Sequence, residues 1–289
     1  MSKPEEYQHL KHAGNHCDVL KHVVFRACVQ EQLNVHENGI ILVDCHAGEG
    51  LYDLSKQTSG DFERGVARVV QNLDQTAPPA VHDYVNAIQE ADEYMQFYPG
   101  SPMLGAKLLR EQDEHRLVDL YVEDVEGLKD GALFWQADVF EADAVEFLVP
   151  NDDDRHKVIL IDPPYLDQED FYRAKVLTER ILDRDPYCTI LLWYPMIQKS
   201  RWRYGYAKSI KDMAKKKAKL GIYQAWLTVD KEGLQGSGMI VVNPTQRFDE
   251  IVDEDTIDWL SATLLNSGRS DYSLEQWMKK KKTKTETEA

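Results

Sequence analysis

The sequence predicts an α/β fold with a mixed sheet of seven strands, whose central strands run parallel and are covered by helices on both faces. Short runs of branched apolar residues, such as residues 157–161, alternate along the chain with longer segments of helical apolar spacing. Two of these runs end in an acidic residue that is followed closely by glycines or prolines. Open α/β sheets bind ligands at the carboxyl ends of their strands, so both positions are candidate sites.

The composition limits the class of protein. The chain has 289 residues, 43% of them hydrophobic, which is enough for one large core. No run approaches the roughly 20 apolar residues of a membrane span, and the first residues lack the apolar core of a signal peptide. Four scattered cysteines, Cys17, Cys28, Cys45 and Cys188, read as reduced, mostly buried thiols of a cytoplasmic protein.

The charge distribution argues against a uniformly basic nucleic-acid binder, because the net charge is −16. A local basic surface is still possible at two places. Residues 199–219 combine lysines and arginines with interleaved aromatics, and residues 279–284 are rich in lysine. Each cluster is either a solvated face or a contact surface for a polyanion, and the sequence leaves both interpretations open.

The most informative motif is Asp162-Pro163-Pro164-Tyr165, which ends a buried strand because proline cannot donate to the sheet ladder. The Asp162 carboxylate and the Pro163 carbonyl can both accept hydrogens from one exocyclic amine, and Tyr165 offers a ring for stacking on a base. Two acceptors on an aromatic amine favour a pyramidal nitrogen and free its lone pair. The motif resembles that of amino-methyltransferases that use S-adenosylmethionine (SAM); the alternative is a Pro-Pro turn beside a surface aspartate.

A second strand, residues 40–44, leads into Gly48-Glu49-Gly50. Glycines at this place let the backbone come close to a ligand. The segment resembles the SAM-binding loop of class I methyltransferases. It departs from the dinucleotide fingerprint because Asp53 stands where the third glycine would fall.

The segment ahead of that strand is polar and rich in histidine, and we interpret residues 7–22 as an active-site flap that runs into a helix capped by Asp18. Its histidines lack the partners of a known metal motif, so no metal site is expected. Residues 52–97 are expected to form a helical insertion with two amphipathic helices around Pro78-Pro79.

The rest of the chain supplies further strands and acids. Ser101 is the expected cap of a helix over residues 103–111. Strands are expected over residues 116–122, which contain Asp119, and over residues 134–138, which end at Asp138. The C-terminal part of the chain is expected to contain strands over 189–195, 224–229 and 237–243, a basic helix within 199–219, a helix over 256–266, and a disordered tail from 279.

Several long stretches together resemble the RlmJ family of 23S ribosomal RNA adenine-N6 methyltransferases, over residues 7–244. The resemblance rests on residues 12–22 (HAGNHCDVLKH), 44–50 (DCHAGEG), 98–102 (YPGSP), 109–113 (LREQD), 162–165 (DPPY), 192–195 (LWYP) and 237–241 (SGMIV). It implies a Rossmann-like class I SAM-dependent methyltransferase with a small helical subdomain. The resemblance also implies how the chain is divided. Residues 1–51 form the N-terminal flap, the first helix and the SAM-binding strand and loop, residues 52–97 form the helical insertion, residues 98–278 form the rest of the methyltransferase domain, and residues 279–289 form the tail.

The resemblance also implies a set of site residues. Those implied for catalysis are Asp162, Pro163 and Tyr165. Those implied for SAM, which leaves as S-adenosylhomocysteine, are His22, His46, Gly48, Ser101, Asp119, Asp138, Val139 and Asp162. Those implied for the substrate are Tyr7, His9, Lys21, Pro164 and Tyr165. The family usually has glutamate at position 119 and glycine at position 139, so this chain departs from it at both.

The implied partner is 23S ribosomal RNA, free or in an early assembly intermediate, methylated by a cytoplasmic monomer without a membrane. Three other functions remain open. A DNA adenine-N6 or cytosine-N4 methyltransferase would use the same tetrapeptide. A protein glutamine methyltransferase usually has asparagine in place of Asp162. A SAM- and RNA-binding assembly factor without turnover would not need the intact motif.

Overall fold

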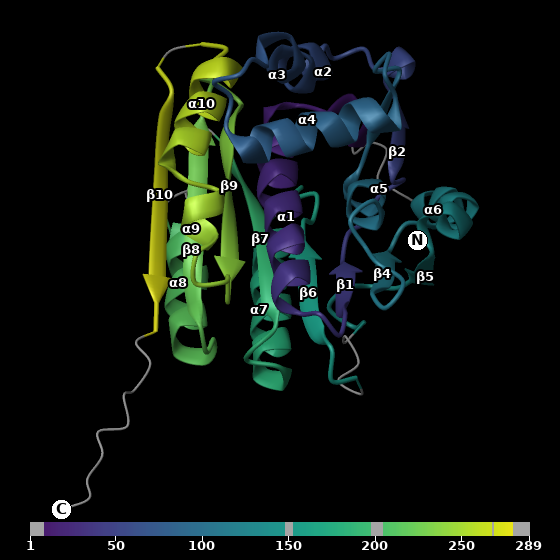
Figure 1. Cartoon of the computed structure of the whole chain (residues 1–289), viewed down its shortest axis with the longest axis vertical. Helices are drawn as coiled ribbons and strands as arrows, with labels where there is room; N and C mark the ends of the chain where they lie inside the picture. Colours follow the sequence, from purple (N-terminus) through teal and green to yellow (C-terminus); the bar gives the residue numbers. More distant parts are fainter. Residues whose placement is uncertain (1–8, 148–152, 198–204, 268, 280–289) are drawn as a thin grey trace, which may run out of the picture.

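The computed structural model describes residues 9–147, 153–197, 205–267 and 269–279, and its centre is a mixed sheet of the order β10-β8-β9-β7-β6-β1-β4-β5 (Figure 1). The strands of this sheet are β1 (Ile40–Asp44), β4 (Glu114–Asp119), β5 (Ala137–Glu141), β6 (His156–Ile161), β7 (Thr189–Ile197), β8 (Gly221–Thr228), β9 (Leu234–Val242) and β10 (Asp271–Met278). A separate antiparallel ribbon pairs β2 (Leu51–Asp53) with β3 (Phe97–Pro99).

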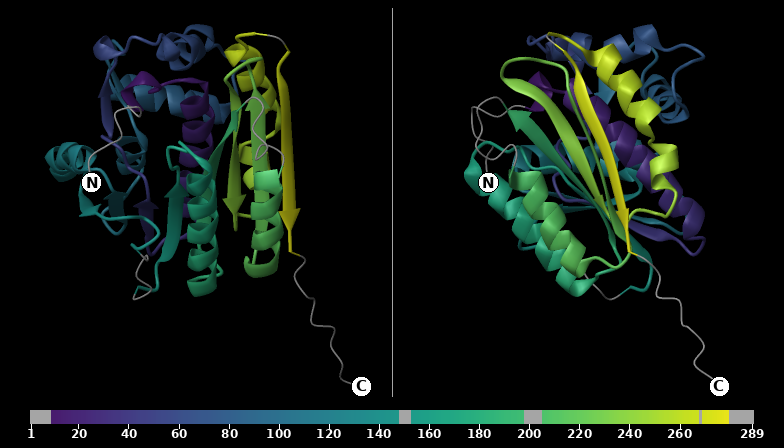
Figure 2. Two further views of the ribbon diagram at one scale, coloured as in Figure 1. Left: turned by 180° about the vertical axis from the view of Figure 1, so that it is seen from behind. Right: turned by 90° about the vertical axis from the view of Figure 1, so that its left-hand side faces the viewer.

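Helices cover both faces of the sheet, with α1 and α10 on one side and α7 and α8 on the other (Figure 2). The helices are η1 (His9–Lys11), α1 (His16–Val35), η2 (Leu54–Lys56), α2 (Asp61–Arg64), α3 (Val66–Asn72), α4 (Pro79–Ala91), α5 (Ser101–Ala106), α6 (Val122–Trp135), α7 (Gln168–Arg184), α8 (Gly205–Lys217), α9 (Phe248–Ile251) and α10 (Glu254–Leu264). None of these described helices is long and apolar enough to span a membrane.

The apolar runs form central strands because each has a core on both sides. Successive side chains of a strand point to opposite faces, so Leu42 and Leu160 pack in the cluster of α1 while Ile41 and Ile159 pack in that of α7. Strands β4, β1, β6 and β7 are parallel neighbours, and β9 and β8 follow as antiparallel strands. The expected α/β class with a mixed sheet is confirmed, and the carboxyl ends of β1, β4 and β6 meet at one edge.

The sheet is wider than the seven strands predicted, because residues 271–278 form an eighth, β10. It pairs antiparallel with β8 along its whole length, from Asp271 opposite Thr228 to Met278 opposite Gly221. It lies at the border of the sheet, where its other edge has no strand partner among the described residues. Its polar, half-exposed sequence lacks the apolar run by which the inner strands are recognised.

Three expected element boundaries are wrong. Asn15, not Asp18, caps α1, because its side chain accepts the backbone N–H groups of Cys17 and Asp18. Helix α5 begins at Ser101 itself and has no side-chain cap. Residues 134–135 end α6, so the predicted strand over 134–138 begins three residues later, with β5.

The insertion shares its core with the first helix. Val81, Tyr84 and Val85 of α4 are buried in the same cluster as the apolar face of α1, and Arg26 of α1 forms an ion pair with Asp83 of α4. The two helices expected around Pro78-Pro79 correspond to α3 and α4. The division of the chain at residues 52 and 97 stays a prediction.

Asn243 joins the loops at the end of the sheet opposite the ligand-binding edge. It is fully buried with a φ of +55°, a left-handed conformation that asparagine tolerates better than most residues. Its side-chain oxygen accepts the N–H groups of Lys219 and Leu220, and its amide nitrogen donates to the carbonyls of Pro186 and Cys188. Every hydrogen-bonding position of this amide is therefore used.

We predict that Asn243→Asp lowers the free energy of unfolding by about 3 kcal/mol or more. The carboxylate would place an acceptor against two carbonyls and carry a buried charge. Urea denaturation followed by circular dichroism measures the change. Asn34→Asp, on the exposed side of α1, is the matched control and is expected to stay within about 0.5 kcal/mol of the parent. Equal effects of both substitutions would contradict this role of Asn243.

Candidate active site

A pocket lies at the carboxyl edge of the parallel strands and encloses about 930 Å³ of empty space, including its solvent-facing part. Ten of the residues that the sequence singled out line it: His9, Lys21, His22, His46, Gly48, Ser101, Asp119, Asp162, Pro163 and Pro164. Tyr7, expected to meet the substrate, lies outside the described residues.

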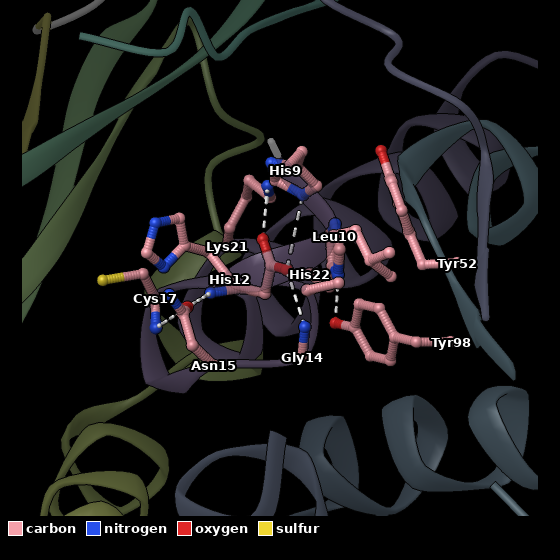
Figure 3. A network of polar contacts seen from close by, with 12 residues as sticks. His9, Leu10, His12, Gly14, Asn15, Cys17, Lys21, His22, Tyr52 and Tyr98 are labelled. Carbon is pink, nitrogen blue, oxygen red and sulfur yellow. Dashed lines mark hydrogen bonds and ion pairs between the residues drawn. The ribbon is translucent and has the colours of Figure 1, made fainter. Parts of the chain in front are cut away.

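The floor of the pocket holds a buried ion triad. The Lys21 ammonium, on the second turn of α1, lies 2.6 Å from the Asp162 carboxylate and 2.7 Å from that of Asp18. Asp18 also accepts the backbone N–H of Gly14, at 2.9 Å, and lies 3.7 Å from the His9 ring nitrogen (Figure 3). The histidine-rich segment thus contacts the same charged groups as the Asp162-Pro163-Pro164-Tyr165 tetrapeptide.

Mutual attraction keeps Asp18 and Lys21 charged. Burial alone would raise the pKa of Asp18, but the Lys21 ammonium and the hydrogen bond from His9 outweigh it, and the pKa lies well below its usual value. Burial alone would lower the pKa of Lys21, yet Asp162 and Asp18 raise it. Both groups are therefore ionised throughout the neutral range.

His22 lies beside this triad with one ring nitrogen unused. Its Nδ1 lies 2.7 Å from the Tyr98 hydroxyl, which lies 3.1 Å from that of Tyr84 (Figure 3). Burial holds the pKa of His22 well below its usual value, so the ring is neutral. Its Nε2 is buried without a partner among the described residues, which is a polar atom that a ligand in the pocket can satisfy.

His46 links the first strand loop to the tetrapeptide. Its Nδ1 accepts the backbone N–H of Asp162 at 3.3 Å, which assigns the ring proton to Nε2. Burial lowers the pKa of His46 to about 4, so this neutral tautomer is present at neutral pH. The strand acid Asp44 is also buried, which raises its pKa to about 6.

A hydrogen bond joins the turn at Gly48 to the Asp119 side chain. The Gly48 N–H donates to the Asp119 carboxylate at 2.9 Å, and a second N–H, that of Tyr121, donates to its other oxygen at 2.9 Å. Gly48 has a φ of +63°, and an added Cβ would come within 2.3 Å of the Tyr52 hydroxyl. Asp119 is thereby fixed at the edge of the pocket, at the end of β4, the strand that pairs with β1.

Asp138, the acid that the sequence predicts to bind the adenine amine, lies away from the residues that line the pocket. Asp138 is the second residue of β5, lies opposite Arg116 and is exposed, because α6 extends through Trp135 and delays the strand. Neither Asp138 nor Val139 is among the residues that line the pocket, whereas Asp143 and Ala144 are. The Ala142 N–H donates to the carbonyl of Asp119, which brings this loop to the pocket edge.

Tyr165, which the sequence predicts to stack on a base, is largely buried in this structure. It has a φ of +50° and is 5% exposed. Its ring packs against Phe171 and Trp193, and its hydroxyl donates to the Trp193 carbonyl at 2.7 Å. In this conformation the ring supports the tetrapeptide, and its stacking on a base stays a prediction.

The basic cluster is largely paired where the structure describes it. On α8, Lys208 pairs with Asp212 within the helix. Lys211 pairs with Glu275 of β10, and Lys217 pairs with two acids of α7. Residues 198–204 and 280–289 lie outside the described part. Lys211 and Lys217 therefore connect α8 to neighbouring elements, and contact of the cluster with a polyanion stays a prediction.

The donors and acceptors of the pocket fit SAM. The Asp119 carboxylate suits ribose hydroxyls, and Asp143 with the apolar walls Ala142 and Val145 suits an adenine ring that carries an amine. The unused His22 Nε2 suits the amino-acid end. No group of three or more histidine, cysteine or acidic side chains within the described residues is placed to hold a metal ion.

Comparison with known proteins gives concordant results. A family model described as "Ribosomal RNA large subunit methyltransferase D, RlmJ" matches residues 37–278. "Ribosomal RNA large subunit methyltransferase J" of Escherichia coli is 31% identical over 278 residues, which cover 91% of this chain and 95% of the relative. The protein of the same name from Haemophilus influenzae is 29% identical over 283 residues, 93% and 97% of the two chains.

The fold has a solved counterpart. The crystal structure of protein LPL1258 from Legionella pneumophila superposes with a TM-score of 0.78 at 23% identity and covers 91% of this chain and 98% of its own. At this identity the likeness shows a shared fold.

The ion triad leads to a double-mutant prediction. Lys21→Met should lower the free energy of unfolding at pH 7 by about 3–5 kcal/mol, because it leaves two buried carboxylates without their cation. Adding Asp18→Asn should recover part of this loss, so the two changes are not additive. Urea denaturation measures both. Lys208→Met, in an exposed ion pair, is the control and should cost less than about 1 kcal/mol.

The same variants carry a pH dependence. The pKa of Asp18 is depressed in the folded protein, so its stabilising contribution is present above the unfolded pKa of about 3.9 and is lost as the pH falls further. The difference in stability between the parent and Lys21→Met should therefore shrink below about pH 4. A difference that stays constant from pH 7 to pH 3, or strictly additive losses, would contradict the triad.

Proposed function

Since this chain belongs to the RlmJ family of ribosomal RNA large subunit methyltransferases, we propose that it methylates the exocyclic N6 of one adenine in 23S ribosomal RNA, with SAM as methyl donor. The observation that carries the proposal is the Asp162 carboxylate at the pocket, beside the rigid Pro163 and Pro164. This arrangement suits an amine that must be held by two acceptors.

Bound SAM supplies a methyl group already activated on a sulfonium. We assign its ribose to Asp119 and its adenine amine to Asp143, in place of Asp138, with the backbone at Ala144 in the role first given to Val139. We assign its amino-acid end to His22 and Ser101. His46, with its proton on Nε2, offers a further donor to the same pocket.

The substrate adenine must leave its stack before N6 reaches the pocket, as in other base-modifying enzymes. Asp162 and the Pro163 carbonyl then accept the two N6 hydrogens and hold the nitrogen in line with the methyl, at roughly 3–3.5 Å. Lys21 bonds one oxygen of Asp162 and leaves the other oxygen for the amine. The surplus proton of N6 passes to water after transfer, so no dedicated base is required.

The state of the RNA substrate, the compartment and the oligomeric state are also part of this proposal. The substrate is free RNA or an early assembly intermediate, because the target base must be accessible to leave its stack and enter the pocket. The protein acts in the cytoplasm, where such intermediates form, and acts as a monomer. A DNA methyltransferase and a SAM-binding assembly factor without turnover are the competing functions.

We predict that Asp162→Ala lowers kcat by roughly 100- to 1,000-fold, the usual loss on removing a group aimed at the reacting centre. S-adenosylhomocysteine affinity should fall by less than about 10-fold, a change of about 1.4 kcal/mol in binding. The assay uses tritiated SAM with protein-free 23S transcript, with duplex DNA in parallel. Asp212→Ala, on exposed α8, is the control and should keep full activity.

Label mapped to N6-methyladenosine in the transcript, and lost in Asp162→Ala, is the expected result. Label in DNA alone would overturn the substrate and keep the chemistry. Full turnover by Asp162→Ala would overturn the role of the tetrapeptide. Absence of label from both polymers, and from ribosome assembly intermediates tested in the same way, would favour the assembly factor.

A further inference from the structure

The first two turns of α7 contact both walls of the pocket. This helix begins directly after the catalytic tetrapeptide. Its Asp170 carboxylate accepts the backbone N–H of Leu166 at 2.7 Å, which holds the exit of the tetrapeptide loop. One turn on, the Arg173 guanidinium forms an ion pair with Asp143, on the loop after β5. Both Asp170 and Arg173 line the pocket themselves.

Asp143 is held at a defined orientation by these contacts. One of its carboxylate oxygens accepts the Val145 N–H at 2.9 Å, and the other accepts from Arg173. Its loop is fixed at one end by the bond from the Ala142 N–H to the Asp119 carbonyl. Arg180, two turns further along α7, donates only to the Val145 backbone carbonyl, at 2.8 Å, so the orientation of the Asp143 carboxylate depends on Arg173. A carboxylate has about four lone-pair sites, so two remain for a ligand.

We propose that Arg173 is a positioning residue that sets the Asp143 carboxylate for the cofactor's adenine amine, and so makes the pocket select a 6-aminopurine. This inference rests on the proposed function, which places the adenine amine at Asp143. The carboxyl group of aspartate rotates in a broad torsional well, so an unrestrained Asp143 would sample orientations that do not face the amine. A planar guanidinium restrains it because its donors have a fixed geometry.

Orientation, not charge, is the contribution expected of Arg173. The side chain of Arg173 is 39% exposed and that of Asp143 is 28% exposed, so solvent screens their attraction. A lysine at position 173 keeps the charge but lacks the fork, and should therefore restore only part of the effect. The contact also ties the cofactor loop to the helix that holds the tetrapeptide exit, so the two walls of the pocket move together.

The test compares two ligands that differ at a single group. S-adenosyl-L-homocysteine carries the 6-amino group, and S-inosyl-L-homocysteine carries a carbonyl oxygen there, which faces a carboxylate unfavourably. Isothermal titration calorimetry measures the Kd of each for the full-length parent, Arg173→Ala, Arg173→Lys and Arg180→Ala. Arg180 is the matched control, because it is an arginine of the same helix that contacts the same loop through a backbone carbonyl.

We expect the parent to bind the adenosyl ligand at least ~10-fold more tightly than the inosyl ligand. A site built to hydrogen-bond an amine binds a ligand with a carbonyl oxygen in that place more weakly. Arg173→Ala should weaken the adenosyl ligand by ~10-fold, the worth of one charge-assisted hydrogen bond, and the inosyl ligand by less than ~3-fold. Arg180→Ala should leave both within ~2-fold. In turnover, Arg173→Ala should raise KM for SAM and leave kcat at saturation within ~2-fold.

Equal weakening of both ligands in Arg173→Ala would overturn the inference and leave Arg173 as a structural tether. Unchanged affinities in that variant would overturn it as well, as would an Arg180→Ala variant that loses the preference to the same extent. A parent protein that binds neither ligand would instead contradict the proposed function, which separates the two failures.

Discussion

The buried Lys21 ammonium, shared between Asp18 and Asp162, is the interaction on which the rest of the site depends. Burying charges costs free energy unless each meets a well-placed partner, so the triad fixes the start of α1 against the end of β6. The histidine-rich segment before α1 is held to this helix through Gly14, whose N–H donates to the Asp18 carboxylate. Cofactor pocket, flap and tetrapeptide are thereby positioned by one cation, which makes their mutual geometry insensitive to the surrounding loops.

The inner sheet could be predicted because its signal is local. A parallel strand buried on both faces must be apolar at every position, and the runs ending near Asp44 and Asp162 meet that requirement. The outer elements could not, because their identity is decided by neighbours. β10 is half polar and becomes a strand only because β8 offers a free edge, and the aromatic residues at 134–135, which favour strands in isolation, are helical because α6 continues through them.

The same distinction explains the site. Seven of the ten predicted residues that line the pocket lie at or just after a strand end, which fixes their position. The other three, His9, Lys21 and His22, belong to the histidine-rich segment and the start of α1. Asp143 lines the pocket and Asp138 does not, because β5 begins only at Ala137, and the sequence does not show where this strand starts. The burial of Tyr165 could not be predicted either, since it depends on a left-handed backbone and on packing against Phe171 and Trp193.

Within the part of the chain that the structure describes, the sheet ends at β10 with an unpaired edge, and this has a consequence for how the protein behaves at high concentration. An unpaired strand edge is a template for pairing with a second molecule, and Trp277 is partly exposed on this strand. The sequence continues from β10 directly into the lysines of residues 279–282, and Glu275 lies on the strand itself. Like charges brought together by edge-to-edge pairing repel, so this lysine-rich stretch can be understood as protection against aggregation, independent of any nucleic acid.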